Sequence, residues 1–356
     1  YGNVCLNCFP GTFCHGLRHR GGDGPQGIQQ VLVGITIGLL LGILAAMRRG
    51  SFWDYMVIAL YVVALVVVGW LASKKVKNAK DYISANRGLG IIVMIGSLAG
   101  AAIGAGGTIG LAGDVYTKGV SGYWQIIGWN IGWLVFSVPA LSTQLIGLGN
   151  MFKVVFSVAG IDLDYKIFVT ISCIIMVFAV FKGGLYSSAY SGTFNFFILA
   201  VVFVICLPIF TCVAAGGASQ AITNIEILPA SFKDLFAGVS VSATLLAIVK
   251  YCFTAGSNIA YVNNTLAAKD AKTARNGSIG GIISYFIIPG IIMVCTLVLI
   301  NVFPNLENPS SVLTFSFLNI FPPVIRGLSV IALIAVVLST ATIWVQNSGK
   351  IFGSDI

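Results

Sequence analysis

The stretch Gly96-Ser-Leu-Ala-Gly-Ala-Ala-Ile-Gly-Ala-Gly-Gly-Thr-Ile-Gly110 lies in the middle of a long apolar run. Glycine is the poorest helix former apart from proline, so the glycines at 104, 106, 107 and 110 favour local unwinding. Unwound backbone at membrane depth is tolerated only where it is buried in protein or lines a cavity. Its freed carbonyls can bind a cation and its freed amides an anion. The same residues also suit a small-residue packing face, so composition alone leaves both interpretations open.

The composition around this stretch is that of a membrane protein. Of the 356 residues, 57% are hydrophobic and only 9% are charged, whereas soluble domains carry roughly a quarter charged residues. The net charge of +9 comes from basic residues in short clusters between apolar runs. Aromatic residues do not alternate with these clusters, so we expect no nucleic-acid partner.

The sequence contains no recognisable combination of catalytic residues. The two histidines stand at positions 15 and 19, outside the apolar runs, so no Ser-His-Asp arrangement can form within them. A phosphate-binding loop of the G-x-x-x-x-G-K type is also absent, which argues against an ATP-driven pump. We expect neither an enzyme nor a bound cofactor.

Apolar runs of about the 20 residues that cross a bilayer as a helix recur along the chain. They are Gly27–Met47, Trp53–Ser73, Gly90–Gly113, Tyr123–Ala140, Leu141–Val158, Leu163–Phe181, Tyr190–Cys212, Leu235–Val262, Ile279–Phe303 and Val324–Val345. Strands of a membrane barrel would be shorter and would alternate in polarity. The runs therefore predict an all-α integral membrane protein.

Basic clusters orient these helices. Lysines and an arginine follow the second run at 74–87, and a second cluster follows the eighth run at 269–275. Because cytoplasmic loops carry an excess of Lys and Arg, both loops are predicted to lie inside. The loops at 114–121, 213–234 and 304–323 then lie outside.

The chain divides into three predicted parts. Residues 1–26 form a polar, Cys-rich leader of unknown role, where Cys5, Cys8, Cys14 and the two histidines leave a zinc site open as an alternative to an unstructured segment. Residues 27–50 form an additional transmembrane helix whose place is uncertain. Residues 51–356 form the main transmembrane domain.

Two further features have chemical interest. Ser339 and Thr340 are adjacent in the last run, where their hydroxyls suit a hard cation such as Na⁺ or bond their own helix backbone. Lys250 lies inside the eighth run. An ionisable group at membrane depth is a functional-site hypothesis by default, set against a lysine whose ammonium reaches the interface.

Several motifs together resemble the sodium:solute symporter family, in the family's order from residue 52 to the end. They are Asp81-Tyr-Ile-Ser-Ala-Asn-Arg87, Ser97-Leu-Ala-Gly100, Gly106-Gly-Thr-Ile-Gly-Leu-Ala-Gly113, Tyr116-Thr-Lys-Gly-Val-Ser-Gly122, Gly183-Gly-Leu185, Thr265-Leu-Ala-Ala-Lys-Asp-Ala-Lys-Thr-Ala-Arg-Asn-Gly277, and Ser339-Thr-Ala with Asn347-Ser348 and Ser354-Asp-Ile356. Each motif is weak alone, whereas their order is specific.

The resemblance implies a leucine-transporter-like bundle of two inverted repeats with broken helices. The first repeat would span about 90–212, and the second, at about 235–356, would be truncated because its last two helices are not found. The family's sodium site would use the carbonyls of Gly100, Ile103 and Val336 and the hydroxyls of Ser339 and Thr340.

The resemblance also places a solute site beside the breaks in the first and sixth core helices. On this chain the first break is at 104–108 and the second at 251–258. The residues expected to line the site are Gly104, Gly106, Gly107, Thr108, Lys250, Tyr251, Thr254, Gly256 and Asn258.

The sequence departs from the family's pattern at three places. Gly192 and Thr342 stand where an aspartate is common, and Asn263-Asn264 replaces a Gln-Arg pair. Each change removes charge and bears on the sodium stoichiometry and on the solute.

We therefore predict a sodium-coupled symporter in the cell membrane that imports a small polar organic solute by alternating access. Its partners would be the solute, sodium as coupling ion and the lipid bilayer. Two alternatives stay open. One is a sodium-independent or proton-coupled carrier that uses Lys250, and the other is a non-transporting membrane sensor or truncated remnant.

Overall fold

The computed structural model describes residues 51–77, 81, 84–135, 184–236, 241–256 and 259–350. Within these ranges every regular element is a helix, and the sole extended pairing is one isolated bridge. The all-α prediction is thereby confirmed. The leader, the additional helix Gly27–Met47 and the runs Leu141–Val158 and Leu163–Phe181 lie outside the described residues.

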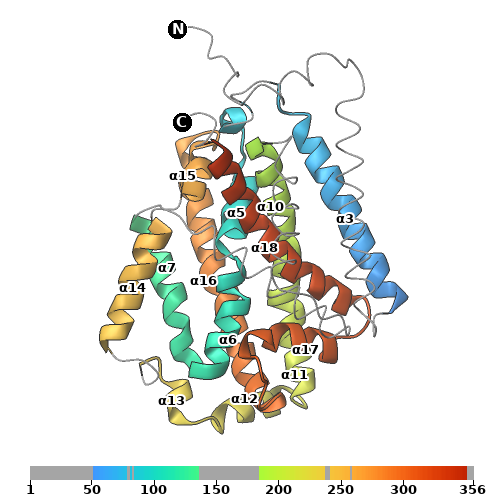
Figure 1. Cartoon of the computed structure of the whole chain (residues 1–356), viewed down its shortest axis with the longest axis vertical. Coiled ribbons are helices and arrows are strands. Elements are labelled where there is room, and N and C mark those ends of the chain that lie inside the picture. The colour runs from blue at the N-terminus through green and yellow to red at the C-terminus, as the bar shows by residue number, and fades with distance from the viewer. Residues whose placement is uncertain are drawn as a thin grey trace, which may run out of the picture.

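The helices follow one another along the chain as Figure 1 shows. They are α3 (Phe52–Ser73), η1 (Ala85–Arg87), α5 (Ile91–Ala102), η2 (Ala105–Gly107), α6 (Ile109–Lys118), η3 (Gly119–Tyr123), α7 (Trp124–Val135), α10 (Gly184–Ala200), η4 (Val201–Cys206), α11 (Leu207–Ala214), α12 (Ala218–Glu226), α13 (Ala230–Lys233), α14 (Val241–Gly256), α15 (Ile259–Leu266), α16 (Ala271–Val302), η5 (Pro309–Ser311), α17 (Val312–Ile320) and α18 (Ile325–Lys350).

Among the described helices, three are long and apolar enough to cross a membrane: α3, the continuous helix Gly184–Ala214 and α16. A fourth span results if the two helices on either side of the glycine-rich break are counted together. Many large apolar side chains on these helices are exposed, Leu60 and Ile283 among them. Since water would disfavour such a surface, lipid is the solvent that fits it.

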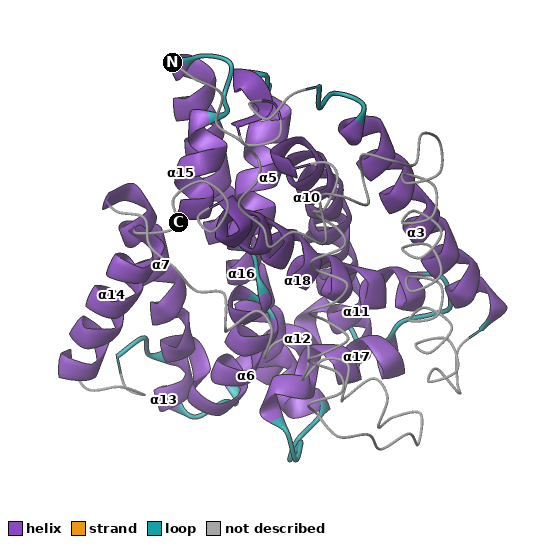
Figure 2. Cartoon of the chain, turned by 45° about the horizontal axis from the view of Figure 1, so that its top comes forward, coloured by secondary structure: helices purple, strands orange, loops and turns teal. Residues whose placement is uncertain are grey.

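The centre of the bundle is formed by α5, α10, α16 and α18. Helix α5 packs against α10 and α16, and α10 packs against α18 and α3. In both views α7 and α14 lie side by side at one edge, and α3 lies at the opposite edge (Figures 1 and 2). The glycine-rich break between α5 and α6 thus lies in the interior of the bundle.

A short backbone pairing brings the two basic clusters to one end of the molecule. The Leu89 amide donates to the Ala267 carbonyl at 3.2 Å, and the Lys269 amide donates to the Leu89 carbonyl at 3.2 Å. The segment before α5 therefore lies against the loop between α15 and α16. The two basic clusters therefore lie at the same end of the molecule, as their predicted cytoplasmic location requires.

Helices α5 and α10 approach each other through glycine. A Cβ atom placed on Gly96 would lie 2.6 Å from Cγ2 and 2.9 Å from Cα of Thr193. One placed on Gly100 would lie 2.8 Å from the Gly192 carbonyl oxygen. Close backbone approach through small residues is typical of helix pairs in lipid, where the hydrophobic effect does not drive helices together. This close approach sets the position of α5 along the helices that face it.

Gly96→Ala should separate α5 from α10 and destabilise the protein, because the new methyl group meets the backbone of Thr193. Overpacking of this kind costs about 1–3 kcal/mol. The measurement is thermal unfolding of the purified protein without sodium. Gly69→Ala on α3 is the matched control, since its Cβ would lie 3.6 Å from Ser187 Oγ, an ordinary contact. Equal melting temperatures for the two variants would contradict the close contact.

Helix α15 carries a buried amide group that has no partner among the described residues. It packs against α5, α16 and α18, and its Asn264 is fully buried. Neither Nδ2 nor Oδ1 of this side chain makes a hydrogen bond. A buried polar group left unpaired costs about 1–3 kcal/mol.

Asn264→Leu should therefore raise the free energy of unfolding by about 1–3 kcal/mol, since an apolar side chain of similar size removes the penalty. Chemical denaturation in detergent measures it. The control is Asn319→Leu on α17, where the side chain is exposed and its Nδ2 donates to the Phe315 carbonyl at 2.7 Å. A loss of stability in Asn264→Leu would show that the amide has a partner such as a bound water.

Candidate sodium site at the helix break

The glycine-rich stretch is broken where the sequence predicts. Helix α5 ends at Ala102, and the chain passes through η2 before α6 begins at Ile109. The helices on either side are bent by 77°. This break interrupts the regular hydrogen bonds of the backbone in the interior of the bundle, where water is not available to replace them.

Two carbonyls at the end of α5 lose their helical donors. The Gly104 amide donates to the Ala102 carbonyl at 2.8 Å instead of to Gly100, and the Gly107 amide donates to the Gly104 carbonyl at 3.1 Å instead of to Ile103. Ile103 is fully buried and has a non-helical ψ of 70°. The carbonyls of Gly100 and Ile103 are thus free of the helical ladder, as a cation site requires.

Helix α18 places two hydroxyls at the Gly100 carbonyl. Ser339 Oγ lies 2.8 Å from this oxygen and 3.0 Å from the Val336 carbonyl oxygen. Thr340 Oγ1 lies 3.2 Å and 3.1 Å from the same two atoms. Both side chains are almost completely buried, with exposed fractions of 1% and 2%. Four of the five oxygens predicted for the sodium site, those of Gly100, Val336, Ser339 and Thr340, are thereby brought together.

The four oxygens fit a small hard cation. Oxygen–metal distances near 2.4 Å, as for Ca²⁺, put neighbouring oxygens of an octahedral site about 3.4 Å apart. The observed separations of 2.8–3.2 Å need a small expansion only. On cation binding the two hydroxyl protons would turn away, and their lone pairs would face the ion. All four donors are neutral, and the buried carboxylates of the described residues, Asp54 and Asp81, lie elsewhere.

The residues predicted to line the solute site continue from this break. Gly104 is extended, and its carbonyl accepts from Thr108 Oγ1 at 3.1 Å. Gly106 is exposed, and a Cβ placed on it would meet nothing within 4 Å. Gly107 is buried against the ring of Tyr285. A Cβ atom placed on Gly107 would lie 3.1 Å from Cε2 of that ring. Open space at the break therefore lies on the Gly106 side.

An aromatic cluster that the sequence reasoning missed lies beside Gly107. The Trp129 ring is 6.4 Å from Tyr251 and 6.3 Å from Tyr285 between centroids, and its Nε1 donates to Tyr261 Oη at 3.1 Å. Tyr251 was predicted for the solute site. The other three come from α7, α15 and α16. Trp129 is one of three tryptophans in the run Tyr123–Ala140, but the periodicity of that run does not predict which residues its ring contacts.

The remaining predicted solute residues lie on α14 or just beyond it. Lys250 is exposed, with its Nζ 5.2 Å from the centroid of the Tyr251 ring. Thr254 and Gly256 are in the last turns of α14, and Asn258 lies outside the described residues. Helix α14 packs chiefly against α7. The residues predicted for the solute site thus fall into two groups, one at the α5–α6 break and one on α14.

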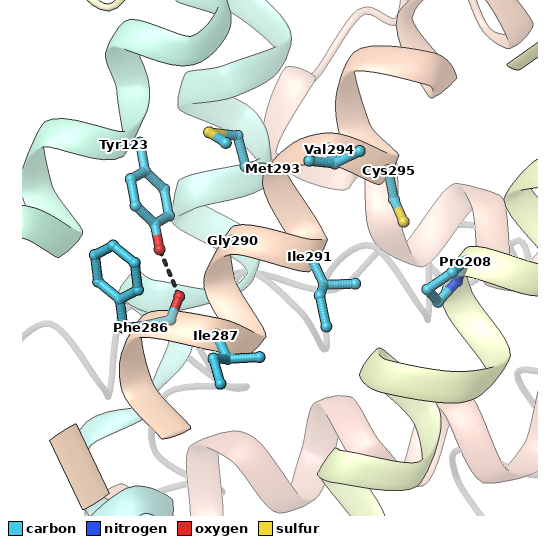
Figure 3. Close-up of a pocket in the computed structure, with 9 residues that line it drawn as sticks. All are labelled: Tyr123, Pro208, Phe286, Ile287, Gly290, Ile291, Met293, Val294 and Cys295. Carbon is cyan, nitrogen blue, oxygen red and sulfur yellow. Dashed lines mark hydrogen bonds between the residues drawn. The ribbon is translucent and has the colours of Figure 1, made fainter. Parts of the chain in front are cut away.

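A separate hollow on α16 holds none of the predicted site residues (Figure 3). It is lined by Tyr123, Pro208, Phe286, Ile287, Gly290, Ile291, Met293, Val294 and Cys295. Tyr123 Oη donates to the Phe286 carbonyl at 2.5 Å, near Pro289 within the helix. The exposed lining of this hollow is almost entirely apolar, and its Tyr123 hydroxyl is engaged with a backbone carbonyl, so the hollow does not suit a cation.

Comparisons with known proteins find chains that are similar to this one, and these chains are transporters. The osmoregulated proline transporter OpuE of Bacillus subtilis (strain 168) is 22% identical over 243 residues, which are 54% of this chain and 47% of that protein. The chain thus spans about half the length of this relative. The structure is similar to one of a Na⁺-coupled sialic acid symporter in a substrate-bound, outward-open state. The TM-score is 0.66 at 16% identity, over 86% of this chain and 74% of that one.

The fold is therefore the leucine-transporter-like helix bundle with broken helices that the motifs imply. A family model described as the sodium:solute symporter family matches residues 130–356. That range includes α18 with Ser339 and Thr340, whereas the break at 104–108 precedes it. Together with the apolar helices and the broken span, the match shows that this integral membrane protein belongs to the sodium:solute symporter family.

Proposed function

We propose that the protein is a sodium-coupled symporter of the cell membrane that imports a small polar organic solute by alternating access. One observation carries this proposal: the oxygens of Gly100, Val336, Ser339 and Thr340 converge at the break in the first core helix. Their chemistry is that of a site for a small monovalent cation. Membership of the family supports sodium as that cation.

Sodium would couple to transport through the break. The ion would join α5 to α18, since each helix supplies part of the oxygen set. Binding would hold the end of α5 in one orientation and order the backbone at Gly104–Thr108, where the solute is proposed to bind. Any gain in solute affinity caused by sodium must equal the gain in sodium affinity caused by solute.

We infer the chemical class of the solute from the residues around the break. Gly106 leaves open space there, and Trp129 and three tyrosines provide rings and hydroxyls nearby. Both named relatives carry polar organic solutes, proline in one and sialic acid in the other. A small polar organic molecule is the class that these observations support.

Lys250 contributes less to the proposal than the sequence suggests. A fixed internal cation that replaces sodium would need a buried ammonium group near the oxygen set, because burial gives a charge its strong influence. The Lys250 side chain is exposed, whereas Ser339 and Thr340 are buried. This contrast supports sodium over the lysine-driven carrier. We retain 51–356 as one transport domain, with repeats at about 90–212 and 235–356.

The first test is the effect of sodium on thermal stability. A cation that binds the folded state only should stabilise it by about 2.7 kcal/mol at 100 times its dissociation constant. Sodium should raise the melting temperature of the purified protein, while potassium and N-methylglucammonium should not. Ser339→Ala combined with Thr340→Val should abolish the response, because two of the oxygen ligands are removed.

Ser329→Ala is the matched control for this experiment. Ser329 is also buried on α18, but its hydroxyl bonds the Ile325 carbonyl of its own helix at 2.8 Å. Its variant should keep the sodium response of the wild type. If sodium stabilises the double variant and the wild type equally, the oxygen set at Gly100 is not the sodium site.

Transport itself is tested in proteoliposomes with radiolabelled proline, a neutral sugar and sialic acid as probes. An inward sodium gradient should drive accumulation of at least one polar solute, and the double variant should lose this accumulation. Collapse of the sodium gradient should reduce uptake to equilibration, because coupling supplies the work. Accumulation that persists without a sodium gradient would exclude sodium coupling.

A further inference from the structure

A buried carboxylate joins the helix that precedes the core to the helix that carries the sodium hydroxyls. Asp54, in the first turn of α3, is fully buried although α3 otherwise presents much of its surface to the outside. A buried charge is costly unless it is paired and hydrogen-bonded. The partners of Asp54 should therefore be specific, and apart from the Ser51 amide they lie 270 or more positions away in the sequence.

Both carboxylate oxygens of Asp54 are used at the start of α18. Oδ1 accepts from the Val324 amide at 2.8 Å and from the Gly327 amide at 3.1 Å. Oδ2 accepts from Arg326 Nη2 at 2.6 Å and Nε at 3.1 Å, and from the Ser51 amide at 2.9 Å. The carboxylate thus binds the Val324 amide just before α18, the Gly327 amide in its first turn, and a guanidinium. Amide groups at a helix start have no partners within their helix.

A glycine lets the two helices meet at this point. A Cβ atom placed on Gly327 would lie 2.9 Å from both Cα and the carbonyl oxygen of Asp54. The backbone of α18 is therefore in direct contact with that of α3. The contact fixes the position, the direction and the rotation of the first turn of α18 with respect to α3.

This contact acts on the sodium oxygens through a continuous helix. Val336 follows Gly327 by nine residues, about 14 Å along a helix that rises 1.5 Å per residue. Helix α18 runs unbroken from Ile325 to Lys350. A rotation or shift of its start moves Ser339 and Thr340 with respect to Gly100, which belongs to a different helix. Sub-ångström displacements matter at a cation site, because oxygen–ion distances are fixed by the ion.

We propose that Asp54 is a positioning residue for the sodium site, which holds α18 in the register that brings Ser339 and Thr340 to the Gly100 carbonyl. Helix α3 is then part of the transport machinery and more than a lipid-facing addition to the core. The inference rests on the proposed sodium coupling, because it concerns the same oxygen set. It assigns sodium affinity and cation selectivity to a residue that does not touch the ion.

The test compares sodium and lithium titrations of the melting temperature for the purified full chain. Asp54→Asn weakens the bonds to Arg326 and keeps the size of the side chain. Gly327→Ala keeps every charge and forces the two backbones apart. Two perturbations of different chemistry should therefore have the same effect on the site, and either one suffices if the other fails to fold.

In both variants the half-saturating sodium concentration should rise about tenfold, which corresponds to about 1.4 kcal/mol. The ratio of lithium to sodium affinity should also change, because displaced oxygens no longer match the size of sodium. A purely structural loss of stability would lower the melting temperature without sodium but leave this ratio unchanged.

Two control variants match the substitutions. Asp114→Asn removes a carboxylate from an exposed pair with Lys118 on α6, and Gly69→Ala adds a methyl group on α3 in ordinary contact. Both should keep wild-type affinity and selectivity.

The inference is overturned if Asp54→Asn or Gly327→Ala folds and keeps the wild-type half-saturating concentration and selectivity ratio. It is equally overturned if both fail to fold even in saturating sodium, since Asp54 would then be needed for the fold as a whole. If the wild-type protein does not respond to sodium, the proposed function fails together with the inference. A wild-type response with unaltered variants would reject the positioning role alone.

Discussion

The hydrogen bonds between α18 and the Gly100 carbonyl are the contact on which the proposed transport site depends. A carbonyl freed by a helix break must find a partner in the interior of a membrane protein, because lipid supplies none. Ser339 and Thr340 satisfy it in this structure. A cation that enters between these oxygens would replace weak hydrogen bonds by ion–oxygen contacts. The break is thus stable enough to persist and still open to a ligand.

Much of the fold could be predicted from the sequence, because the signals are local. Length and apolarity mark α3 and α16 as spans, and the clustered glycines mark the break between α5 and α6. Both features are local, because they depend on neighbouring residues in the chain and on the solvent that surrounds the helix. The sequence also predicts that the break exposes backbone carbonyls. Their assignment to Gly100, Ile103 and Val336 needed the resemblance to a family, since any residue supplies a carbonyl.

Contacts between distant segments could not be predicted in the same way. The pairing of Asp54 with Arg326 joins positions 272 apart, and nothing in the two local sequences marks them as partners. The gathering of Tyr261 and Tyr285 around Trp129 is of the same kind, because three helices must pack before the rings meet. Lys250 is a further case that the local sequence leaves open. Its position within an apolar run allows both a functional ammonium group and one that reaches the interface, and the structure leaves the side chain exposed.

The bare contact between Gly100 and Gly192 has a consequence for the proposed transport cycle. Side chains that interlock must leave their grooves before one helix slides on another, and this creates a barrier. Here the two backbones meet without side chains, and a Cβ on Gly192 would be 3.7 Å from the nearest atom, Cα of Ser97. At this position no side chain would impede sliding of α5, whereas Thr193 Oγ1 donates to the Val93 carbonyl at 3.2 Å across the same interface. In the proposed transport cycle, occupancy of the oxygen set would then bias the orientation of α5 through its contact with α18.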